Sequence, residues 1–259
     1  MEIIKSKDNP LVKRFILLKD NKRERTLSGQ FVIEGLRFCK EAVLNNAKIH
    51  TVLMTEEFLN KHPEDAELIG NSCNDVKLIS EVISKRISDT VNSQGVYCVC
   101  SIALKEQKLC GNKFIALENL QDPGNIGTVI RTAQAFGIDG VCLVGNCADV
   151  YSPKVLRSTM GTIFTTPIYR FSDINDAYKE FKNNNLFIYG AILDEKATVL
   201  SGIKFKNGSV CLIGNEANGL SAAAKEVCDE FVFIDMPGNA ESLNASVAAS
   251  VIMWEMIKK

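Results

Sequence analysis

Three loops contain most of the side chains whose types and spacing could serve chemistry. In the first, residues 118–133 (ENLQDPGNIGTVIRTA), Asp122 can cap a helix, and Gly124 and Gly127 let the backbone approach a ligand closely. Arg131 lies in the helix that follows, off the apolar stripe that marks its core face. Taken alone, such an arginine is most simply a solvated side chain.

The second and third loops each follow an apolar strand. The second, Gly214–Gly219, is on its own most simply a glycine-rich turn with a helix cap. Its two glycines are five residues apart, so the G-x-G-x-x-G dinucleotide fingerprint is absent. The third loop, residues 234–244, leads into a helix of small residues, where Ser242 or Asn244 could be a simple helix cap.

Histidine and cysteine chemistry find no support in the spacing. His50 and His62 are twelve residues apart, which disfavours a histidine acid or base and most triad hydrolases. Neither C-x-x-C nor H-x-x-x-H occurs, so we expect no metal site. Cys98 and Cys100 share one face of VYCVCSI, as on a buried strand, and are best explained as core side chains.

The composition indicates an ordinary globular protein. The 259 residues include 30 Lys+Arg and 31 Asp+Glu, and the formal net charge of −1 disfavours both a wholly basic DNA-coating protein and a disordered acidic chain. The opening MEIIKSKDNP lacks a signal-peptide core, and no run nears the roughly 18 apolar residues that a membrane span needs. With nine cysteines and no secretory segment, we expect a reduced, cytoplasmic protein.

The elements that must position the three loops alternate between strand and helix. Continuous apolar strands (KFIALE, GVCLVG, LFIYGAI, SVCLIG and EFVFID) are separated by helical stretches, which predicts an α/β fold with a mainly parallel sheet covered on both faces. Ligands on such sheets bind beyond the carboxyl ends of the strands. The loops to inspect are therefore those after KFIALE, SVCLIG and EFVFID, which are the three loops above.

The first half has a different character. Its first 25 residues hold eight Lys/Arg against four Asp/Glu, and Asn9 followed by Pro10 predicts a helix start. Strand-like FVIEG, HTVLM, VKLIS and VYCVCSI follow, with a polar stretch between residues 60 and 74. The charged segment 104–112 ends in Gly-Asn, so we place a linker there, between domains of residues 1–103 and 113–259.

Together the three loops resemble the signature of the SpoU/TrmH family of RNA ribose 2′-O-methyltransferases, part of the SPOUT superfamily. The matching segments are N-I-G-x-x-x-R-T-A at Asn125–Ala133, G-N-E-x-x-G-L at Gly214–Leu220 and E-S-L-N-x-S-V-A-A at Glu241–Ala249, in the family's order. The basic first half, with N-P-x-V-K at Asn9–Lys13 and F-V-I-E-G at Phe31–Gly35, resembles the small α/β substrate-binding domain of many members.

The resemblance implies a C-terminal methyltransferase domain with a deep trefoil knot, and a homodimer whose active sites lie at the subunit interface. It implies S-adenosylmethionine as methyl donor, contacted by Gly214, Ile234, Met236 and Leu243. It implies a catalytic Arg131, with the ribose and donor side of the site lined by Asn125, Glu216, Ser242 and Asn244. This chain has Asp235 where the family usually has proline, and a carboxylate beside the donor would alter the local charge.

The resemblance also gives these residue types a chemistry. Arg131 can hold an adjacent phosphate and stabilise the alkoxide that forms on the ribose. We favour this electrostatic role over a general base, because arginine is effectively always protonated. In the N-terminal domain we expect RNA to contact Lys13, Arg14, Lys22 and Arg23.

The RNA itself is open. We favour ribosomal RNA because of the appended basic domain, with transfer RNA as the alternative. Two readings from other classes remain: an RNA-binding protein with a degenerate donor site, and a nucleotide-cofactor enzyme of the doubly wound α/β type. The intact motif residues argue against the first, and the missing G-x-G-x-x-G argues against the second.

Overall fold

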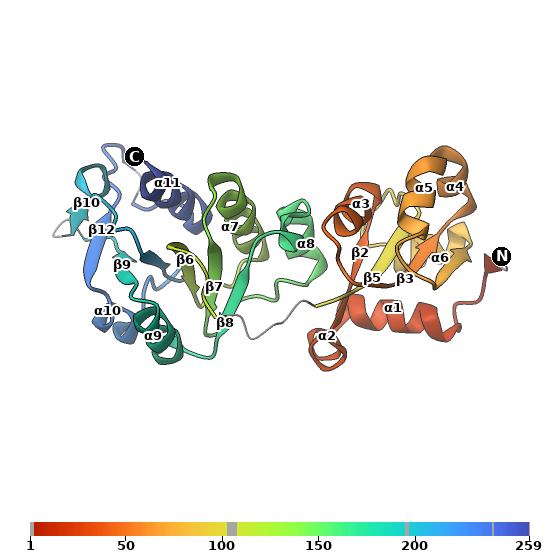
Figure 1. The fold of residues 1–259 in the computed structure, drawn as a ribbon, viewed down its shortest axis with the longest axis horizontal. Coiled ribbons are helices and arrows are strands. Elements are labelled where there is room, and N and C mark those ends of the chain that lie inside the picture. Colours follow the sequence, from red (N-terminus) through yellow and green to blue (C-terminus); the bar gives the residue numbers. More distant parts are fainter. Residues whose placement is uncertain (1–2, 103–107, 195–196, 240, 259) are drawn as a thin grey trace. The chain divides into compact units, whose positions relative to one another are not determined.

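A computed structural model describes residues 3–102, 108–194, 197–239 and 241–258. Two compact units divide the chain (Figure 1). Unit 1 comprises Met1–Lys105 together with Tyr151–Phe164, and unit 2 comprises Glu106–Val150 with Thr165–Lys259. The predicted linker of residues 104–112 stays a prediction, and its residues 104–107 lie outside the described residues.

Unit 1 is built on a mixed five-stranded sheet. Its strands, in spatial order, are β1 (Ile3–Ile4), β4 (Val76–Ile79), β3 (Ile49–Met54), β5 (Val96–Ser101) and β2 (Gln30–Glu34). β5 runs antiparallel to both β2 and β3. The helices of this unit are α1 (Pro10–Asp20), α2 (Lys22–Ser28), α3 (Leu36–Leu44), α4 (Glu56–Lys61), α5 (Pro63–Gly70), α6 (Glu81–Ile87) and α8 (Pro153–Thr159).

Local sequence explains where α1 begins. The Oδ1 of Asn9 accepts a hydrogen bond from the Leu11 amide at 2.9 Å, and a proline occupies the first helical position, as predicted. The polar stretch 60–74, for which the sequence predicts no particular element, contains α5 and the end of α4. These helices bury only three side chains between them, Phe58, Ala66 and Ile69, which is too few to make a visible helical period.

Cys98 and Cys100 are fully buried in β5, which confirms them as core side chains. Burial raises the pKa of the Cys100 thiol well above its usual value. A hydrogen bond with Cys39, together with burial, raises the pKa of the Cys98 thiol in the same way. Both are therefore neutral, unreactive thiols at physiological pH.

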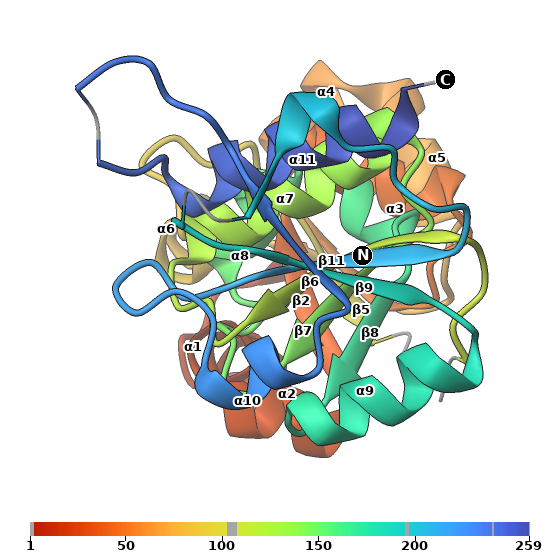
Figure 2. The same cartoon turned by 90° about the vertical axis from the view of Figure 1, so that its left-hand side faces the viewer.

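Unit 2 has an all-parallel seven-stranded sheet, as predicted. Its strands, in spatial order, are β10 (Thr198–Val199), β12 (Glu230–Phe233), β9 (Phe187–Ala191), β11 (Ser209–Ile213), β6 (Lys113–Glu118), β7 (Gly140–Val144) and β8 (Ile168–Phe171). Helices α7 (Pro123–Phe136) and α11 (Ala245–Ile257) cover one face, and α9 (Ile174–Asn183) and α10 (Ala222–Glu226) cover the other (Figures 1 and 2).

The register of this sheet brings the chemically interesting loops together. Ile213 at the end of β11 lies opposite Leu117 of β6, and the ends of β9 and β12 are paired through Ala191 and Val232. The carboxyl ends of these strands therefore open on one edge of the sheet. After β12 the chain returns to α11, which packs against α7, β6 and β11. The trefoil knot implied by the resemblance stays a prediction.

The described part of the chain shows neither a candidate membrane span nor a candidate metal-binding cluster. None of its helices combines the length and the apolar character that crossing a bilayer requires. No group of three or more His, Cys, Asp or Glu side chains is arranged there to hold a metal ion.

Candidate active site

A cavity of about 1260 Å³ opens at the shared edge of the unit 2 sheet. Its walls come from the segments that follow β9, β11 and β12 and from the first turn of α11. Seven of the nine predicted catalytic and donor-binding residues line it, namely Gly214, Glu216, Ile234, Met236, Ser242, Leu243 and Asn244. Residues more than 20 positions apart in the sequence thus share one site.

The loop after β11 is a tight turn closed by its own backbone. The amide of Asn215 donates to the Gly219 carbonyl at 3.1 Å, and the Gly219 amide donates back at 2.9 Å. A Cβ atom on Gly214 would lie 2.1 Å from the carbonyl carbon of Gly219 and 2.3 Å from the Leu220 nitrogen. Glycine is therefore required at position 214 by the close approach of the two arms of the turn.

Two contacts attach this loop to the end of β6. Glu118 is buried, and its carboxylate accepts hydrogen bonds from the Ser221 amide at 2.9 Å and the Ser221 hydroxyl at 2.6 Å. The side-chain amide of Asn215 donates to the Asn119 carbonyl at 2.9 Å. Because a buried carboxylate without partners is costly, these bonds fix the loop firmly against the sheet.

Asn125 and Glu216 meet at the border of the cavity. The backbone amide of Asn125 donates to Asp122 Oδ1 at 2.8 Å, and this bond is the predicted helix cap. Asn125 is therefore held in the first turn of α7. Its side-chain Nδ2 donates to Glu216 Oε1 at 3.0 Å. Asn125 does not itself line the cavity, but it orients a carboxylate that does.

Cavity-lining and solvent-exposed residues alternate at the start of the third loop. Ile234 and Met236 line the cavity, whereas Asp235 between them is exposed and is not among the lining residues. We expected the Asp235 carboxylate, at the position where the family usually has proline, to lie beside the donor. Asp235 does not line the cavity. Asn244 caps α11, with Oδ1 accepting from the Ser246 amide at 2.9 Å, and it also lines the cavity.

Arg131 lies apart from the other predicted residues. It is exposed on α7 and does not line the cavity. It follows Asn125 by six residues, which on an α-helix corresponds to about 9 Å along the axis and about 120° around it. Within one chain, therefore, the structure gathers the predicted donor-binding residues and Asn125 but leaves Arg131 on another face of α7.

One wall of the cavity was missed from the sequence. Ala191, the last residue of β9, and the three residues after it, Ile192, Leu193 and Asp194, contribute to its lining. A signal existed, because every strand of a parallel sheet ends at the same edge and β9 pairs with β11. Predicting that adjacency requires the strand order, which apolar periodicity does not contain.

The predicted RNA-contacting residues lie on α1 and α2 of unit 1. Lys13 forms an ion pair with Asp8 at 2.8 Å, and Arg14 donates to Gln30 Oε1 at 2.7 Å; all four predicted residues are exposed. The neighbouring Arg25 is different, because it is buried and its guanidinium donates to main-chain carbonyls at the end of α1. Part of the basic excess in the sequence is therefore structural.

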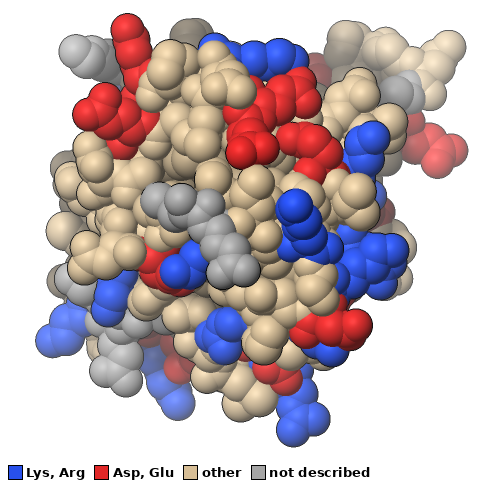
Figure 3. Space-filling model, turned by 90° about the vertical axis from the view of Figure 1, so that its right-hand side faces the viewer, with Lys and Arg blue, Asp and Glu red and all other residues tan. Residues whose placement is uncertain are grey.

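Charge is unevenly distributed over unit 1. Acidic side chains gather near the top of the face shown in Figure 3, at the height where Figure 1 places α4 and α5, whose first turns contain Glu56, Glu57, Glu64 and Asp65. Most Lys and Arg side chains lie in the middle and lower parts of that face (Figure 3). A polyanion would approach this face through its lower part.

Comparisons with known proteins agree with this arrangement. The sequence model of the SpoU rRNA Methylase family matches residues 112–254, and that of the MRM3-like substrate binding domain matches residues 9–98. The chain is 33% identical to the 23S rRNA (guanosine(2553)-2′-O)-methyltransferase RlmP of Bacillus subtilis, with 99% of each chain covered.

Solved structures give the same result. An AdoMet-bound rRNA methyltransferase from Sinorhizobium meliloti superposes with a TM-score of 0.87 and 26% identity, covering 98% of this chain and 97% of that one. The SpoU methyltransferase AviRb from Streptomyces viridochromogenes, in complex with AdoMet, superposes with a TM-score of 0.85 and 26% identity, covering 96% and 97%.

Proposed function

The chain belongs to the SpoU rRNA Methylase family, and on that premise we propose that it methylates the ribose 2′-hydroxyl of a guanosine in 23S rRNA. The function class is an S-adenosylmethionine-dependent rRNA 2′-O-methyltransferase. The guanosine is the finer proposal, and the full-length 33% identity to RlmP is the observation that carries it. We place the enzyme in the cytoplasm, with the ribosomal RNA on which it acts.

The residues of the unit 2 cavity fit the methyl donor. When bound, S-adenosylmethionine supplies an electrophilic methyl group. Ile234, Met236 and Leu243 offer apolar surface for its adenine, and the closed turn at Gly214 presents backbone groups rather than side chains. At about 1260 Å³ the cavity has room for a whole nucleoside with its amino-acid tail.

The acceptor ribose is held by neutral donors and acceptors beside this cavity. Ser242 and Asn244, which line the cavity, supply these neutral groups, and Asn125 keeps the Glu216 carboxylate in one orientation. Attack on the methyl carbon has to be in line, so this side of the site contributes mainly by positioning the hydroxyl. Arg131 binds the phosphate next to the ribose and stabilises the negative charge that develops on the 2′-oxygen as its proton passes to solvent water.

We place Arg131 at a cavity completed by a second copy of the chain. Within one chain Arg131 is exposed and outside the cavity. Helix α11 also exposes Val247 (47%) and Trp254 (50%), which are two helical turns apart on one face, and the Phe136 ring of α7 lies 5.5 Å from the Trp254 ring. An exposed tryptophan beside a second aromatic ring is typical of a buried interface.

Trp254→Lys should therefore weaken the dimer. We expect its dissociation constant to rise at least about 30-fold, the effect of losing one interface hot spot of about 2 kcal/mol. Light scattering during size-exclusion chromatography measures this. Leu44→Lys, at an exposed site on α3 in unit 1, is the matched control and should leave the dimer intact. A wild-type protein that is monomeric at micromolar concentration and fully active would contradict the shared site.

Replacing Lys13, Arg14, Lys22 and Arg23 together by Ala should weaken RNA binding in a salt-dependent manner. Each phosphate contact adds roughly 0.7–0.9 to the slope of log affinity against log salt, so we expect the slope to fall by up to about 3. Filter binding at several salt concentrations measures it. Lys61→Ala, on the acidic side of unit 1, is the control. An unchanged slope would make these four side chains ordinary solvated residues.

The substrate class is tested by incubating the purified enzyme with tritiated donor and unmodified total RNA. After separation of the RNAs by size, we expect label in 23S rRNA and background counts in transfer RNA. Label found mainly in transfer RNA would overturn the proposed substrate while leaving the enzyme class intact.

A further inference from the structure

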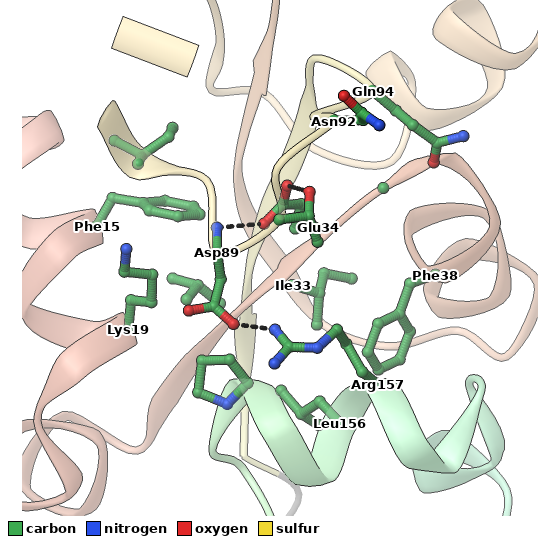
Figure 4. Close-up of a pocket in the computed structure, with 15 residues that line it drawn as sticks. Phe15, Lys19, Ile33, Glu34, Phe38, Asp89, Asn92, Gln94, Leu156 and Arg157 are labelled. Carbon is green, nitrogen blue, oxygen red and sulfur yellow. Dashed lines mark hydrogen bonds and ion pairs between the residues drawn. The ribbon is translucent and has the colours of Figure 1, made fainter. Parts of the chain in front are cut away.

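Unit 1 contains a cavity that none of the predicted site residues lines. It measures about 190 Å³ and lies between α1, the end of β2, the start of α3, the segment 88–95 and α8 (Figure 4). Its volume is below the roughly 300–1000 Å³ of pockets for drug-sized ligands and suits a single planar ring system. Every lining residue belongs to unit 1.

The inner wall of this cavity is apolar. Val32, Ile33, Ile87 and Leu156 contribute it and are buried, and the Phe15 ring lies at one side (Figure 4). The half-buried Phe38 closes another side. Flat, apolar walls of this kind accept the faces of an aromatic heterocycle.

The mouth of the cavity carries amide groups that can read such a ring. Asn92 and Gln94 are exposed there (Figure 4). Gln94 uses its Oε1 to accept a hydrogen bond from the Leu36 amide at 2.9 Å, which aims the side chain and keeps its NH₂ group for another acceptor. Amides of this type bind the hydrogen-bonding edge of an unpaired base.

The acidic groups of the cavity are already neutralised or bonded. Asp89 forms an ion pair with Arg157 of α8, and the Glu34 carboxylate accepts from the Asp89 amide at 2.8 Å and the Thr90 hydroxyl at 2.7 Å. Lys19, on the same helix as Lys13 and Arg14, also lines the cavity. A nucleic acid chain therefore meets little net repulsion at this opening.

From this geometry we propose that the unit 1 cavity binds one unpaired base of the RNA substrate. This base is turned out of its strand and belongs to a different nucleotide from the one that is methylated. This inference rests on the proposed function, since it assumes that RNA is the substrate. It gives unit 1 a role in choosing the sequence or structure of the target, in addition to the phosphate contacts of α1 and α2. Stacking and edge contacts with one base account for a substantial part of the affinity of single-stranded sites.

Plugging the cavity tests the proposal. Asn92→Trp puts a large indole at the mouth, whereas Val91→Trp adds the same group at the adjacent, fully exposed position that does not line the cavity. With an unmodified 23S rRNA fragment containing the methylated site, we expect Asn92→Trp to weaken binding about tenfold or more. Val91→Trp should stay within about twofold of wild type, and both variants should bind S-adenosylmethionine normally.

Ultraviolet cross-linking of the same fragment to the wild-type protein supplies a second readout. Mass spectrometry should find the cross-linked base on peptides containing Phe38 or Asn92. Equal RNA affinity for the two tryptophan variants, with no cross-link in these peptides, would overturn the proposal. So would tight binding of free nucleoside monophosphates in the cavity without any effect of Asn92→Trp on RNA.

These outcomes are separate from those that test the proposed function. Binding and cross-linking do not require methyl transfer, so an enzyme that binds the fragment through the cavity but labels another RNA would refute only the substrate. Conversely, normal methylation of 23S rRNA by Asn92→Trp with unchanged affinity would refute only the cavity.

Discussion

Arg131→Ala lowers the turnover number for methyl transfer by about 100- to 1000-fold in this account, the usual cost of removing one group that stabilises developing negative charge. The dissociation constant for S-adenosylmethionine should change less than about twofold, because Arg131 does not line the unit 2 cavity in which we propose that the donor binds. Tritium transfer to 23S rRNA measures the first quantity and calorimetry the second.

Two further variants sharpen this result. Arg131→Lys should remain severely impaired, because an ammonium group cannot reproduce the planar, two-pronged hydrogen bonding of a guanidinium to phosphate. Gln134→Ala, at another exposed position of α7, should be nearly as active as wild type. Donor binding that is lost together with activity in Arg131→Ala would show that this residue belongs to the donor side.

Mixing two inactive variants shows whether Arg131 acts across the dimer. If it does, a hybrid of Arg131→Ala with a donor-site variant has one site with both defects and one site with none. Co-expressed subunits should then regain up to about half of the wild-type activity per hybrid dimer. If Arg131 acts within its own chain, both sites of the hybrid carry a defect and no activity returns.

Gly214→Ala should weaken S-adenosylmethionine binding by about 100-fold or more. The added Cβ would lie 2.1 Å from the carbonyl carbon of Gly219, so the turn must open and move the backbone that lines the cavity. A displacement of about 1 Å in a binding or catalytic constellation is enough for an effect of this size. Calorimetry with the full chain measures the loss.

The matched control is Gly238→Ala in the neighbouring loop. A Cβ at Gly238 meets no atom within 4 Å, so donor affinity should stay close to wild type. Thermal unfolding and far-ultraviolet circular dichroism separate a local effect from unfolding, since both proteins should keep the wild-type helix content. Unchanged donor affinity in a folded Gly214→Ala would mean that the turn is not part of the donor site.

Much of unit 2 could be predicted from the sequence because its signals are local. Buried parallel strands are continuous apolar runs, and the Asp122 cap marks the start of α7. The residues proposed for the donor side lie at one edge of the sheet because each of their loops follows a strand, and parallel strands end together. Only the family resemblance, however, attached a particular ligand and reaction to them.

Features that depend on tertiary arrangement were not predictable in this way. The cavity of unit 1 combines Phe15, Gln94 and Arg157, which come from three distant parts of the sequence and form no motif. Residues 151–164 lie within the match to the catalytic family yet pack in unit 1, where Leu156 is buried. A domain cut by sequence position alone would leave that apolar surface of α8 uncovered, so the tests above use the full chain.

The chemical position of the transferred methyl group decides whether this protein methylates ribose. Labelled 23S rRNA is hydrolysed completely with alkali, which cannot cleave next to a 2′-O-methylated ribose. We expect the label in a dinucleotide whose 5′ nucleoside is 2′-O-methylguanosine, and almost no such label with Arg131→Ala. Label recovered as a mononucleotide with a methylated base would contradict ribose methylation and, with it, the roles assigned to Arg131, Asn125 and Glu216.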